Sequence, residues 1–420
     1  MLDINLIREH VDAVKEGVAK KGVDSKIVDK LLRRDEVWRE KAKALDDLKA
    51  EQNEVTKEIA KKHTKGALSR ARLLKQQITK LSDEETHLKQ QRDVLLEKLP
   101  NIPFDDVPVG KNDKDNVELR QVGKQPEFDF KPKDYLTVAE QLGIIDVKRA
   151  AVVAGSRFGY LLGGAARLEF ALIQFAIETI TAEGFIPVVP PVMIRPEIMR
   201  RMGKGTFIDD HDAFRIDEDD LYLVGSSEHT IGPLHIDETL REKDLPRRYV
   251  GFSTCFRREA GSYGRDTRGI LRVHQFDKVE MFSFVHPEKS EEEHQFLLAI
   301  QECLMQKLEL PYRVVEVCTG DMTWSDARQY DIETWLPSEK QYRETHSCSN
   351  TTDFQARGIR ARFIQEGMNK PQYMHTLNAT GFAIGRTIVA IIENYQTKQG
   401  TVRVPPVLQS WTGSKEIDVI

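Results

Sequence analysis

The sequence has few cysteines and no long apolar run. Four cysteines occur among the 420 residues, at positions 255, 303, 318 and 348, and none belongs to a C-x-x-C pair. We therefore expect neither a zinc site nor a disulfide framework. No stretch of 18 or more apolar residues exists, so no membrane-spanning helix is expected. The first residues, Met1-Leu2-Asp3-Ile4-Asn5, resemble neither a secretory signal nor an organelle leader, which makes the reducing cytoplasm the expected compartment.

Two common nucleotide-binding loops are also missing. The sequence contains neither G-x-x-x-x-G-K-[ST] nor G-x-G-x-x-G. ATP, if it is a substrate, is then held by neither a P-loop nor a Rossmann turn. Arginine side chains and magnesium would have to bind its phosphates instead.

The overall charge argues mildly against a nucleic-acid partner, and one segment of the chain is basic. The formal net charge is -5, whereas nucleic-acid-binding proteins are often basic. Residues 61–99, however, contain 10 Lys and Arg against 5 Asp and Glu. This excess is typical of a surface that contacts phosphates, but charge alone favours a solvated helix face.

Two heptad segments predict an antiparallel coiled-coil hairpin over about 27–99, preceded by an amphipathic helix over 3–20. The first arm carries the stripe Ile27, Leu31, Trp38, Leu45, Leu48, Val55 and Ile59. In the second arm Leu74, Leu81, Leu88 and Leu95 recur at intervals of seven, with Ile78 and Leu99 at the other seam position. His63-Thr64-Lys65-Gly66 is a turn signal between them. Each arm should be about 50 Å long. Spacing alone leaves open a dimerisation or spacer element and a lever that contacts a distant polyanion.

Three regions are predicted along the chain: a helical domain over 1–105, a linker over 106–134 and a second domain over 135–420. Pro100, Pro103 and Pro108 end the second arm, and a stretch containing Gly, Pro and Asp follows. In the second domain an amphipathic helix is expected over 168–182. Strand-like runs occupy 185–189, 222–224, 249–256, 276–284 and 312–317, and the run 388–392 is expected to be helical.

The most informative pattern lies at 255–280. Two strand-like runs flank a loop rich in Gly, Arg and Asp, which predicts a hairpin. Arg257 and Glu259 should point to one face because strand side chains alternate. An arginine can bind a phosphate with two N–H groups, a glutamate can accept from an adenine amino group, and Phe276 can stack on a base. A lone R-x-E is usually a surface ion pair, whereas the full pattern F-R-x-E, loop, R-x-x-x-F-x-x-x-E is far more specific.

That pattern resembles motif 2 of the class II aminoacyl-tRNA synthetases, here over about 249–284. Gly184-Phe-Ile-Pro-Val-Val-Pro-Pro191 resembles motif 1 (about 168–192), and Gly381-Phe-Ala-Ile-Gly-Arg-Thr387 resembles motif 3 (about 378–395). Three further features are similar to the seryl-tRNA synthetases: the motif 2 loop 261–276, the segments Thr319–Met322 and Arg343–Ser349, and the coiled-coil hairpin. The resemblance covers essentially the whole chain.

The resemblance implies an α+β fold, in which a mostly antiparallel sheet of about six to eight strands is flanked by helices and preceded by a helical hairpin. It also implies a homodimer. The implied reaction joins L-serine to ATP as seryl-adenylate with release of pyrophosphate and then transfers serine to tRNA(Ser), and to tRNA(Sec) where that tRNA exists. The arm would grip the long variable arm of the tRNA. Arg265 and Arg268 of the motif 2 loop would meet its acceptor end, although exposed arginines are more often only solvated.

The resemblance also assigns an ATP site. Arg257 would bind the α-phosphate, Glu259 would read the adenine amino group, and Phe276 and Arg386 would enclose the adenine. Mg2+ would be held by Glu344 and Ser347, since oxygen ligands suit this cation. The whole predicted set is Arg257, Arg258, Glu259, Arg272, Val273, Phe276, Glu344, Thr345, His346, Ser347 and Arg386, with Arg257, Glu344 and Arg386 as the catalytic residues.

The resemblance also assigns a pocket for the substrate serine. The expected residues are Ser226, Ser227, Glu228, Glu280, Asn378 and Thr380. Glu228 and Glu280 would bind the substrate ammonium and hydroxyl. Ser226 departs from the family's threonine, which keeps the hydroxyl, removes a methyl contact and suggests a higher serine KM. Such a pocket should reject alanine, because its buried polar groups would be left unpaired, and threonine for lack of room.

Three alternatives compete with this interpretation. A catalytically silent tRNA-binding paralogue would have lost Arg257, Glu259, Glu344 or Arg386, and all four are present. A ligase that charges a carrier protein would lack the coiled-coil arm. A synthetase for another amino acid would differ in the motif 2 loop, and the change at Ser226 keeps this alternative open.

Overall fold

The structure is a computed structural model that describes residues 1–62, 64–261, 264 and 266–419. It divides into two compact units, Met1–Ile102 and Pro103–Ile420. Within the described ranges, no helix combines the length and the apolar character needed to cross a membrane.

The first unit is entirely helical. Its helices are α1 (Ile4–Glu9), α2 (Val11–Lys20), α3 (Lys26–Lys61) and α4 (Lys65–Glu97). The amphipathic pattern over 3–20 forms two helices instead of one, because His10 leaves the helical conformation at φ -128° and ψ 49°. The Asp3 side chain caps α1 by accepting from the Asn5 N–H, and Thr64 caps α4 by accepting from the Ala67 N–H. Of the predicted turn, His63 lies outside the described residues.

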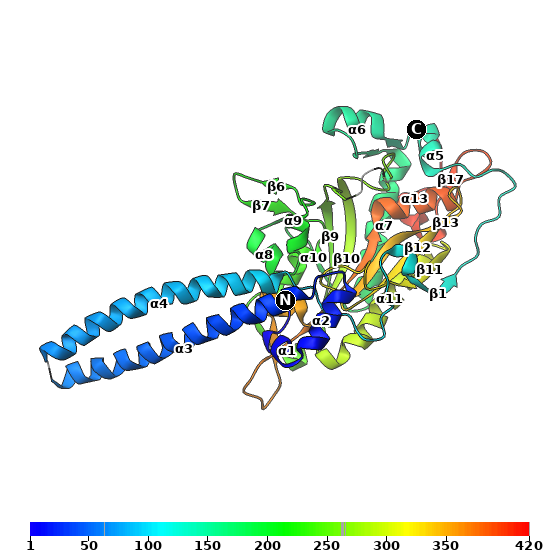
Figure 1. Ribbon diagram of the computed structural model, residues 1–420. Helices are drawn as coiled ribbons and strands as arrows, with labels where there is room; N and C mark the ends of the chain where they lie inside the picture. Colours follow the sequence, from blue (N-terminus) through cyan, green and yellow to red (C-terminus); the bar gives the residue numbers. More distant parts are fainter. Residues whose placement is uncertain (63, 262–263, 265, 420) are drawn as a thin grey trace. The chain divides into compact units, whose positions relative to one another are not determined.

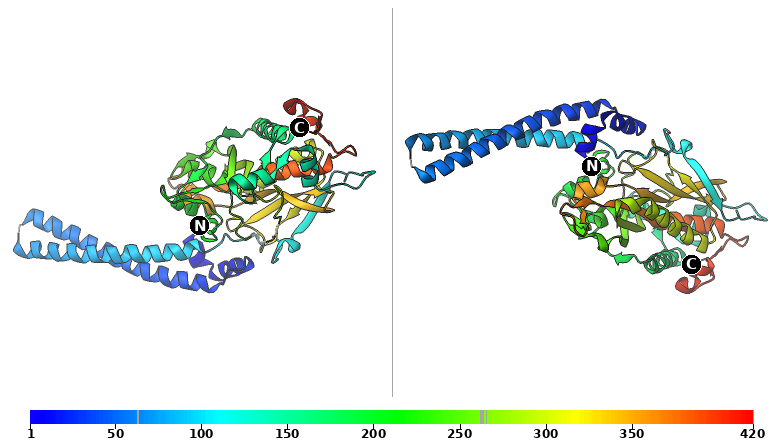
Figure 2. Two further views of the ribbon diagram at one scale, coloured as in Figure 1. Left: turned by 90° about the horizontal axis from the view of Figure 1, so that it is seen from above. Right: turned by 90° about the horizontal axis from the view of Figure 1, so that it is seen from below.

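The helices α3 and α4 pack along their length as an antiparallel pair, seen as the blue hairpin in Figures 1 and 2. This confirms the predicted hairpin. Leu31, Leu45, Val55 and Leu74 of the predicted seam are buried, and the other predicted seam residues are buried or half-buried. Lys41 Nζ lies 3.1 Å from Glu84 across the pair. The heptad stripe therefore predicted both the helices and their contact face.

One buried carboxylate interrupts the apolar seam. Asp35 is fully buried, and Arg8, Arg39 and Arg92 lie 2.8, 3.1 and 3.8 Å from its oxygens. The Arg92 guanidinium also stacks on the Trp38 ring at 4.2 Å. A single polar seam position of this kind fixes the register of a coiled coil, because a shift would bury the charge unpaired.

The second unit is built on an eight-stranded sheet. Its order is β1 (Val117–Val122), β11 (Tyr312–Glu316), β12 (Arg328–Leu336), β13 (Gln341–Asn350), β16 (His375–Ala383), β10 (Gln275–Val285), β9 (Arg247–Phe256) and β4 (Ile186–Val188). Every neighbouring pair is antiparallel except β4 and β9. The sheet confirms the predicted α+β fold. The strand-like runs and the helical run 388–392 are also found as predicted.

Helices also occur throughout the second unit. They are α5 (Tyr135–Leu142), α6 (Val147–Ala154), α7 (Gly163–Ala182), α8 (Pro196–Arg201), α9 (Gly205–Asp209), α10 (Glu228–Ile231), α11 (Ser290–Lys307), α12 (Phe354–Ile359), α13 (Ile384–Asn394) and α14 (Gln409–Thr412). Short 3-10 turns are η1 (Asp113–Asp115), η2 (Gly232–His235), η3 (Glu242–Asp244), η4 (Pro287–Lys289) and η5 (Pro406–Leu408). The main apolar core packs α7, α11 and α13 against the central strands.

Small sheets surround the main one. They pair β15 (Gln372–Tyr373) with β14 (Arg362–Ile364) and β8 (Thr239–Arg241), β17 (Val402–Arg403) with β18 (Glu416–Ile417), β2 (Ile145–Asp146) with β3 (Tyr160–Leu161), and β5 (Met193–Ile194) with β7 (Leu221–Leu223) and β6 (Arg215–Ile216). The segment 106–134 differs from the linker that its composition predicts, because β1 within it pairs with β11 at the sheet edge. Strand β1 carries Val117, Leu119 and Val122, but it is short and mostly exposed, and it was not predicted as a strand.

Candidate active site

A polar cavity of about 530 Å3 lies over the central strands of the second unit. Residues of β10, β12, β13 and β16 form its floor, and side chains from α9, α10, α13 and the segment after β9 form its walls. Strand register explains why distant residues meet there. Glu280 of β10 is paired with Thr380 of β16, and Asp331 of β12 with Ser347 of β13.

Aromatic and cationic side chains line one part of the cavity. The Arg257 guanidinium carbon lies 5.3 Å from the centre of the Phe276 ring, and Arg257 Nε donates to the Gly225 carbonyl at 3.1 Å. Glu259 accepts from Arg272 at 2.7 Å. These side chains leave a cation beside an aromatic face, an arrangement that suits a phosphorylated base.

Opposite charges also meet at the start of α13. Arg386 lies 3.1 Å from Glu344 Oε1, and its guanidinium also donates to the Glu344 carbonyl at 3.0 Å. Burial opposes ionisation of Glu344, but Arg386 and Arg257 outweigh it and lower its pKa. Burial and the charge of Glu344 instead raise the pKa of Asp331 well above its ordinary value. Ser347 also lines this part of the cavity.

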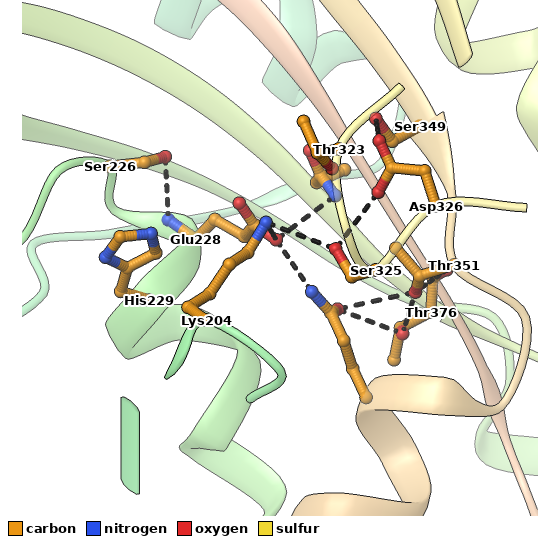
Figure 3. Close-up of polar contacts among 12 residues, drawn as sticks. Lys204, Ser226, Glu228, His229, Thr323, Ser325, Asp326, Ser349, Thr351 and Thr376 are labelled. Atoms are coloured by element: carbon orange, nitrogen blue, oxygen red, sulfur yellow. Dashed lines mark hydrogen bonds and ion pairs between the residues drawn. The ribbon is translucent and has the colours of Figure 1, made fainter. Parts of the chain in front are cut away.

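A second part of the cavity is small, buried and hydrogen-bonded. Glu228 at the start of α10 accepts at Oε1 from Gln355 at 2.7 Å and from Asn378 at 3.3 Å. Ser226 Oγ accepts from the Glu228 N–H at 3.2 Å, as Figure 3 shows. Thr380 is 3% exposed. The pocket therefore offers a fixed carboxylate and several hydroxyl and amide groups to a small polar molecule.

Most predicted site residues line this one cavity. They are Ser226, Glu228, Arg257, Glu259, Arg272, Val273, Phe276, Glu344, Thr345, Ser347, Asn378, Thr380 and Arg386. Four others do not line it: Ser227, Arg258, Glu280 and His346. Glu280 is buried in the floor, 2.6 Å from Lys278 Nζ. Arg258 instead stacks on Phe214 at 4.5 Å and donates to the Ala213 carbonyl. Arg265 lies outside the described residues.

Some cavity residues were missed by the sequence analysis. Lys278 stands inside the motif 2 pattern, two residues before Glu280, so strand alternation could have found it. Asp331 lies on β12, for which no strand was predicted. Lys204 lies between two short helices, and Gln355 lies at the start of α12. Neither has a local pattern that separates it from an ordinary surface residue.

Comparison with known proteins identifies the family. Residues 1–103 match the seryl-tRNA synthetase N-terminal domain, and residues 213–395 match the tRNA synthetase class II core domain (G, H, P, S and T). The serine–tRNA ligase of Pyrococcus horikoshii is 44% identical, over 99% of this chain and 97% of its own length. The chain belongs to the seryl-tRNA synthetase family. The serine–tRNA ligase of Thermotoga petrophila is also similar, with 42% identity over 99% of this chain and 100% of its own.

Solved structures agree with this family membership. The crystal structure of the Pyrococcus horikoshii seryl-tRNA synthetase complexed with ATP has a TM-score of 0.92 and 43% identity, covering 100% of both chains. The cytoplasmic serine–tRNA ligase of Naegleria fowleri in complex with AMP has a TM-score of 0.87 and 32% identity, covering 100% of this chain and 99% of its own. The family's reaction is the ATP-dependent ligation of serine to tRNA(Ser), and this chain is an enzyme of that class.

Proposed function

We propose that this cavity binds ATP and L-serine side by side, forms seryl-adenylate with release of pyrophosphate, and then transfers serine to the 3′ end of tRNA(Ser). The observation that carries the proposal is the convergence of Arg257, Glu344, Arg386 and Glu228 on one cavity of about 530 Å3. A site of this size can hold both substrates. Holding two reactants in one site lowers the barrier by aligning them.

ATP would occupy the aromatic and cationic part. Phe276 and Arg257 would meet the adenine and the α-phosphate, Arg386 would reach the γ-phosphate, and Glu259 would accept from the adenine amino group. In the structure Glu259 is bound to Arg272, which holds its carboxylate in place beside the cavity. Fixed cations aimed at the reacting phosphate stabilise the charge that develops on it. Arg258 and His346 would act through their neighbours, since they do not line the cavity, whereas Thr345 lines it and would contribute directly.

The residues present also fit a magnesium ion. Glu344 and Ser347 offer a carboxylate and a hydroxyl, which are the oxygen ligands that Mg2+ prefers. Asp331 also lines the cavity and adds a second carboxyl group near Glu344. Bound there with ATP, Mg2+ would neutralise phosphate charge. Within the described ranges, His, Cys, Asp and Glu do not form a group of three that could hold a metal by themselves.

Serine would occupy the small hydrogen-bonded part. Glu228 would bind its ammonium, and Glu280, Thr380 and Asn378 would surround its hydroxyl. Ser226 leaves the position of a threonine methyl empty, so we expect a higher serine KM than a threonine would give. Alanine would leave buried polar groups unpaired and should be rejected. Ser227 is buried beside this pocket and would support its wall.

Membership of the seryl-tRNA synthetase family suggests the macromolecular partners of this chain. The arm α3–α4 would bind the variable arm of tRNA(Ser), and of tRNA(Sec) where that tRNA exists, and the motif 2 loop with Arg268 would meet the acceptor end. Two copies of the chain would form a homodimer that works in the cytoplasm. No side chain is assigned as general base for the transfer step.

ATP–pyrophosphate exchange against all twenty amino acids, with magnesium and without tRNA, tests the proposal. Serine alone should support exchange, at a rate far above those of threonine, alanine and cysteine. Exchange with a different amino acid would mean that the pocket around Ser226 and Thr380 has been assigned to the wrong substrate. Well-folded protein without exchange would favour the silent tRNA-binding paralogue.

A further inference from the structure

A lysine that the family motifs do not include reaches into the serine part of the cavity. Lys204 lies in the connection between α8 and α9. Its Nζ is 3.0 Å from Glu228 Oε1 and 3.3 Å from Ser325 Oγ. The Lys204 side chain is 16% exposed and the Glu228 side chain 6%, so both charges are largely withdrawn from solvent. Figure 3 shows Lys204 between Glu228 and Ser325.

The backbone holds Lys204 in a defined place. Gly203 has φ +73°, which ends α8, and the Lys204 N–H donates to the Met199 carbonyl at 3.1 Å. A Cβ at Gly203 would lie 2.6 Å from the Phe354 ring, so the connection is packed closely against α12. Lys204 therefore enters the cavity from a fixed turn.

Three donors converge on one oxygen of Glu228. These donors are Lys204, which immediately precedes α9, Gln355 of α12 and Asn378 of β16, and all three donate to Oε1. Three donors at one oxygen fix the rotation of the carboxylate and leave Oε2 as the oxygen for a ligand. Gln355 is itself held by Thr351 and Thr376, which donate to its Oε1 at 3.4 and 3.1 Å.

The charges around Glu228 explain why a cation is needed. The titratable and charged neighbours of Glu228 come from several elements. They are Lys204, His229 on α10, Lys278 and Glu280 on β10, Arg257 after β9, and Asp326 before β12. Burial would raise the pKa of Glu228, but Lys204, His229 and the hydrogen bond from Gln355 together lower it to about 2. Burial alone would lower the pKa of Lys204, and Glu228 and Asp326 raise it. Burial lowers the pKa of His229 to about 3, so His229 is neutral at neutral pH.

We infer that Lys204 is a positioning residue for amino-acid binding, which keeps Glu228 ionised and turned so that its free oxygen can accept from the substrate ammonium. This inference rests on the proposed function, since it assigns Glu228 to the ammonium of serine. Lys204 does not touch the reacting phosphate. Its effect should therefore appear in serine binding and leave ATP binding unchanged.

A competing role for Lys204 predicts the opposite result. If Lys204 occupied the position of the substrate ammonium, it would have to be displaced by serine. Removing it would then lower the serine KM. A positioning role predicts a higher KM, because Glu228 would lose both an ion pair and a hydrogen bond.

The test compares K204M, K204R and the control K289M in serine-dependent ATP–pyrophosphate exchange. Lys289 forms an ion pair of similar length with Glu292, 2.9 Å, but both side chains are about 70% exposed (69% and 75%). We expect K204M to raise the serine KM about tenfold or more, since hydrogen bonds between charged groups are the strong ones. The ATP KM of all three variants should match that of the wild type. The melting temperatures of K204R and K289M should match it as well.

The pH profile separates positioning from general disruption. In the wild type the pKa of Glu228 is lowered to about 2, so it stays ionised from pH 8 to 6 and the serine KM should not rise over this range. In K204M, burial and the charge of Glu280 would raise the pKa of Glu228, and the serine KM should rise over this range. K204R should keep the wild-type profile. If K204M fails to fold, K204Q, which keeps a donor without charge, replaces it with the same expectation.

Four outcomes would overturn the inference: a serine KM in K204M that is unchanged, one that is lower, equal damage in K204R and K204M, or a K204M profile without pH dependence. Each of these would leave the proposed function standing, because the wild type would still exchange with serine. A wild type without serine-dependent exchange would overturn the proposed function and this inference together.

Discussion

Two carboxyl groups in the second unit, the buried Glu228 and the half-buried Glu169, have opposite environments. Glu228 has a cation at 3.0 Å, and its pKa is lowered to about 2. Glu169 on α7 instead lies beside the carboxyl group of Asp277. Burial and a hydrogen bond with Asp277 raise the pKa of Glu169 to about 8. Glu169 is therefore protonated near neutral pH, and the folded state must keep this proton.

Glu169→Gln should make the protein more stable at neutral and higher pH. The folded pKa of Glu169 lies above its ordinary 4.5, so its stabilising contribution is complete below about pH 4.5 and is lost as the pH rises to about 8. Glutamine needs no proton and can still donate to Asp277. After a discount for solvent screening, we expect a gain of about 1 kcal/mol at pH 8. Urea unfolding of both proteins from pH 5 to 9 measures it.

The pH dependence of the difference is the decisive quantity. The free energy of unfolding of Glu169→Gln minus that of the wild type should grow between about pH 5 and 8 and stay constant above. Glu178→Gln on the same helix is the matched control, because Glu178 is hydrogen-bonded only to the nearby Gln174 in an exposed position. A difference that does not change with pH would mean that Glu169 is ionised in the folded protein.

At the scale of elements, periodicity in the sequence predicted helices and their contact faces, but it missed elements that depend on contacts between distant parts of the chain. The stripe from Ile27 to Ile59 and the leucines from Leu74 to Leu95 specify α3 and α4 and their common face. Strand β1 is short and mostly exposed, and its pairing with β11 is a long-range contact that periodicity does not specify. The residues of the site likewise fall into those that a sequence motif predicts and those that only the fold brings together. Arg257 and Phe276 lie within one motif and were predicted, whereas Lys204 meets Glu228 only because two distant segments fold together.

Shortening the arm should separate the two steps of the reaction. Residues 44–81 would be replaced by a four-residue glycine–serine turn, which keeps the ion pair of Lys41 with Glu84 and the buried Asp35 cluster. Serine-dependent pyrophosphate exchange should stay within about twofold of the wild type, because the cavity is built from the second unit alone. Charging of tRNA(Ser) should fall by about 100-fold through the lost phosphate contacts.

The two activities must be measured on the same preparation. A control variant would keep the arm and replace only Leu73, which is 56% exposed, by serine, and it should charge tRNA normally. Equal loss of exchange and charging in the shortened protein would make the arm a structural element. Full charging by the shortened protein would place the main tRNA contacts elsewhere.

At the scale of the whole molecule, five exposed apolar side chains lie within residues 160–193. Tyr160, Phe170, Ile186, Val189 and Met193 are all more than 40% exposed, and they lie on β3, α7, β4 and the residues that follow up to β5. Phe170 alone is 72% exposed. Grouped exposed apolar residues mark interaction surfaces in soluble proteins. The same residue range carries the motif 1 resemblance, so we predict that it contributes to the contact between two copies.

The protein should be a dimer at micromolar concentration, and Phe170→Glu should convert it to a monomer. A charge placed where an aromatic side chain is buried between two copies leaves that charge unpaired and costs about 3 kcal/mol or more. Light scattering after size-exclusion chromatography measures the mass against 48.1 kDa for one chain. Met368→Glu is the matched control, since Met368 is 56% exposed away from this region and its loss should leave the dimer intact. A dimeric Phe170→Glu protein would place the interface on another face, and a monomeric wild type would remove the homodimer from the proposed function.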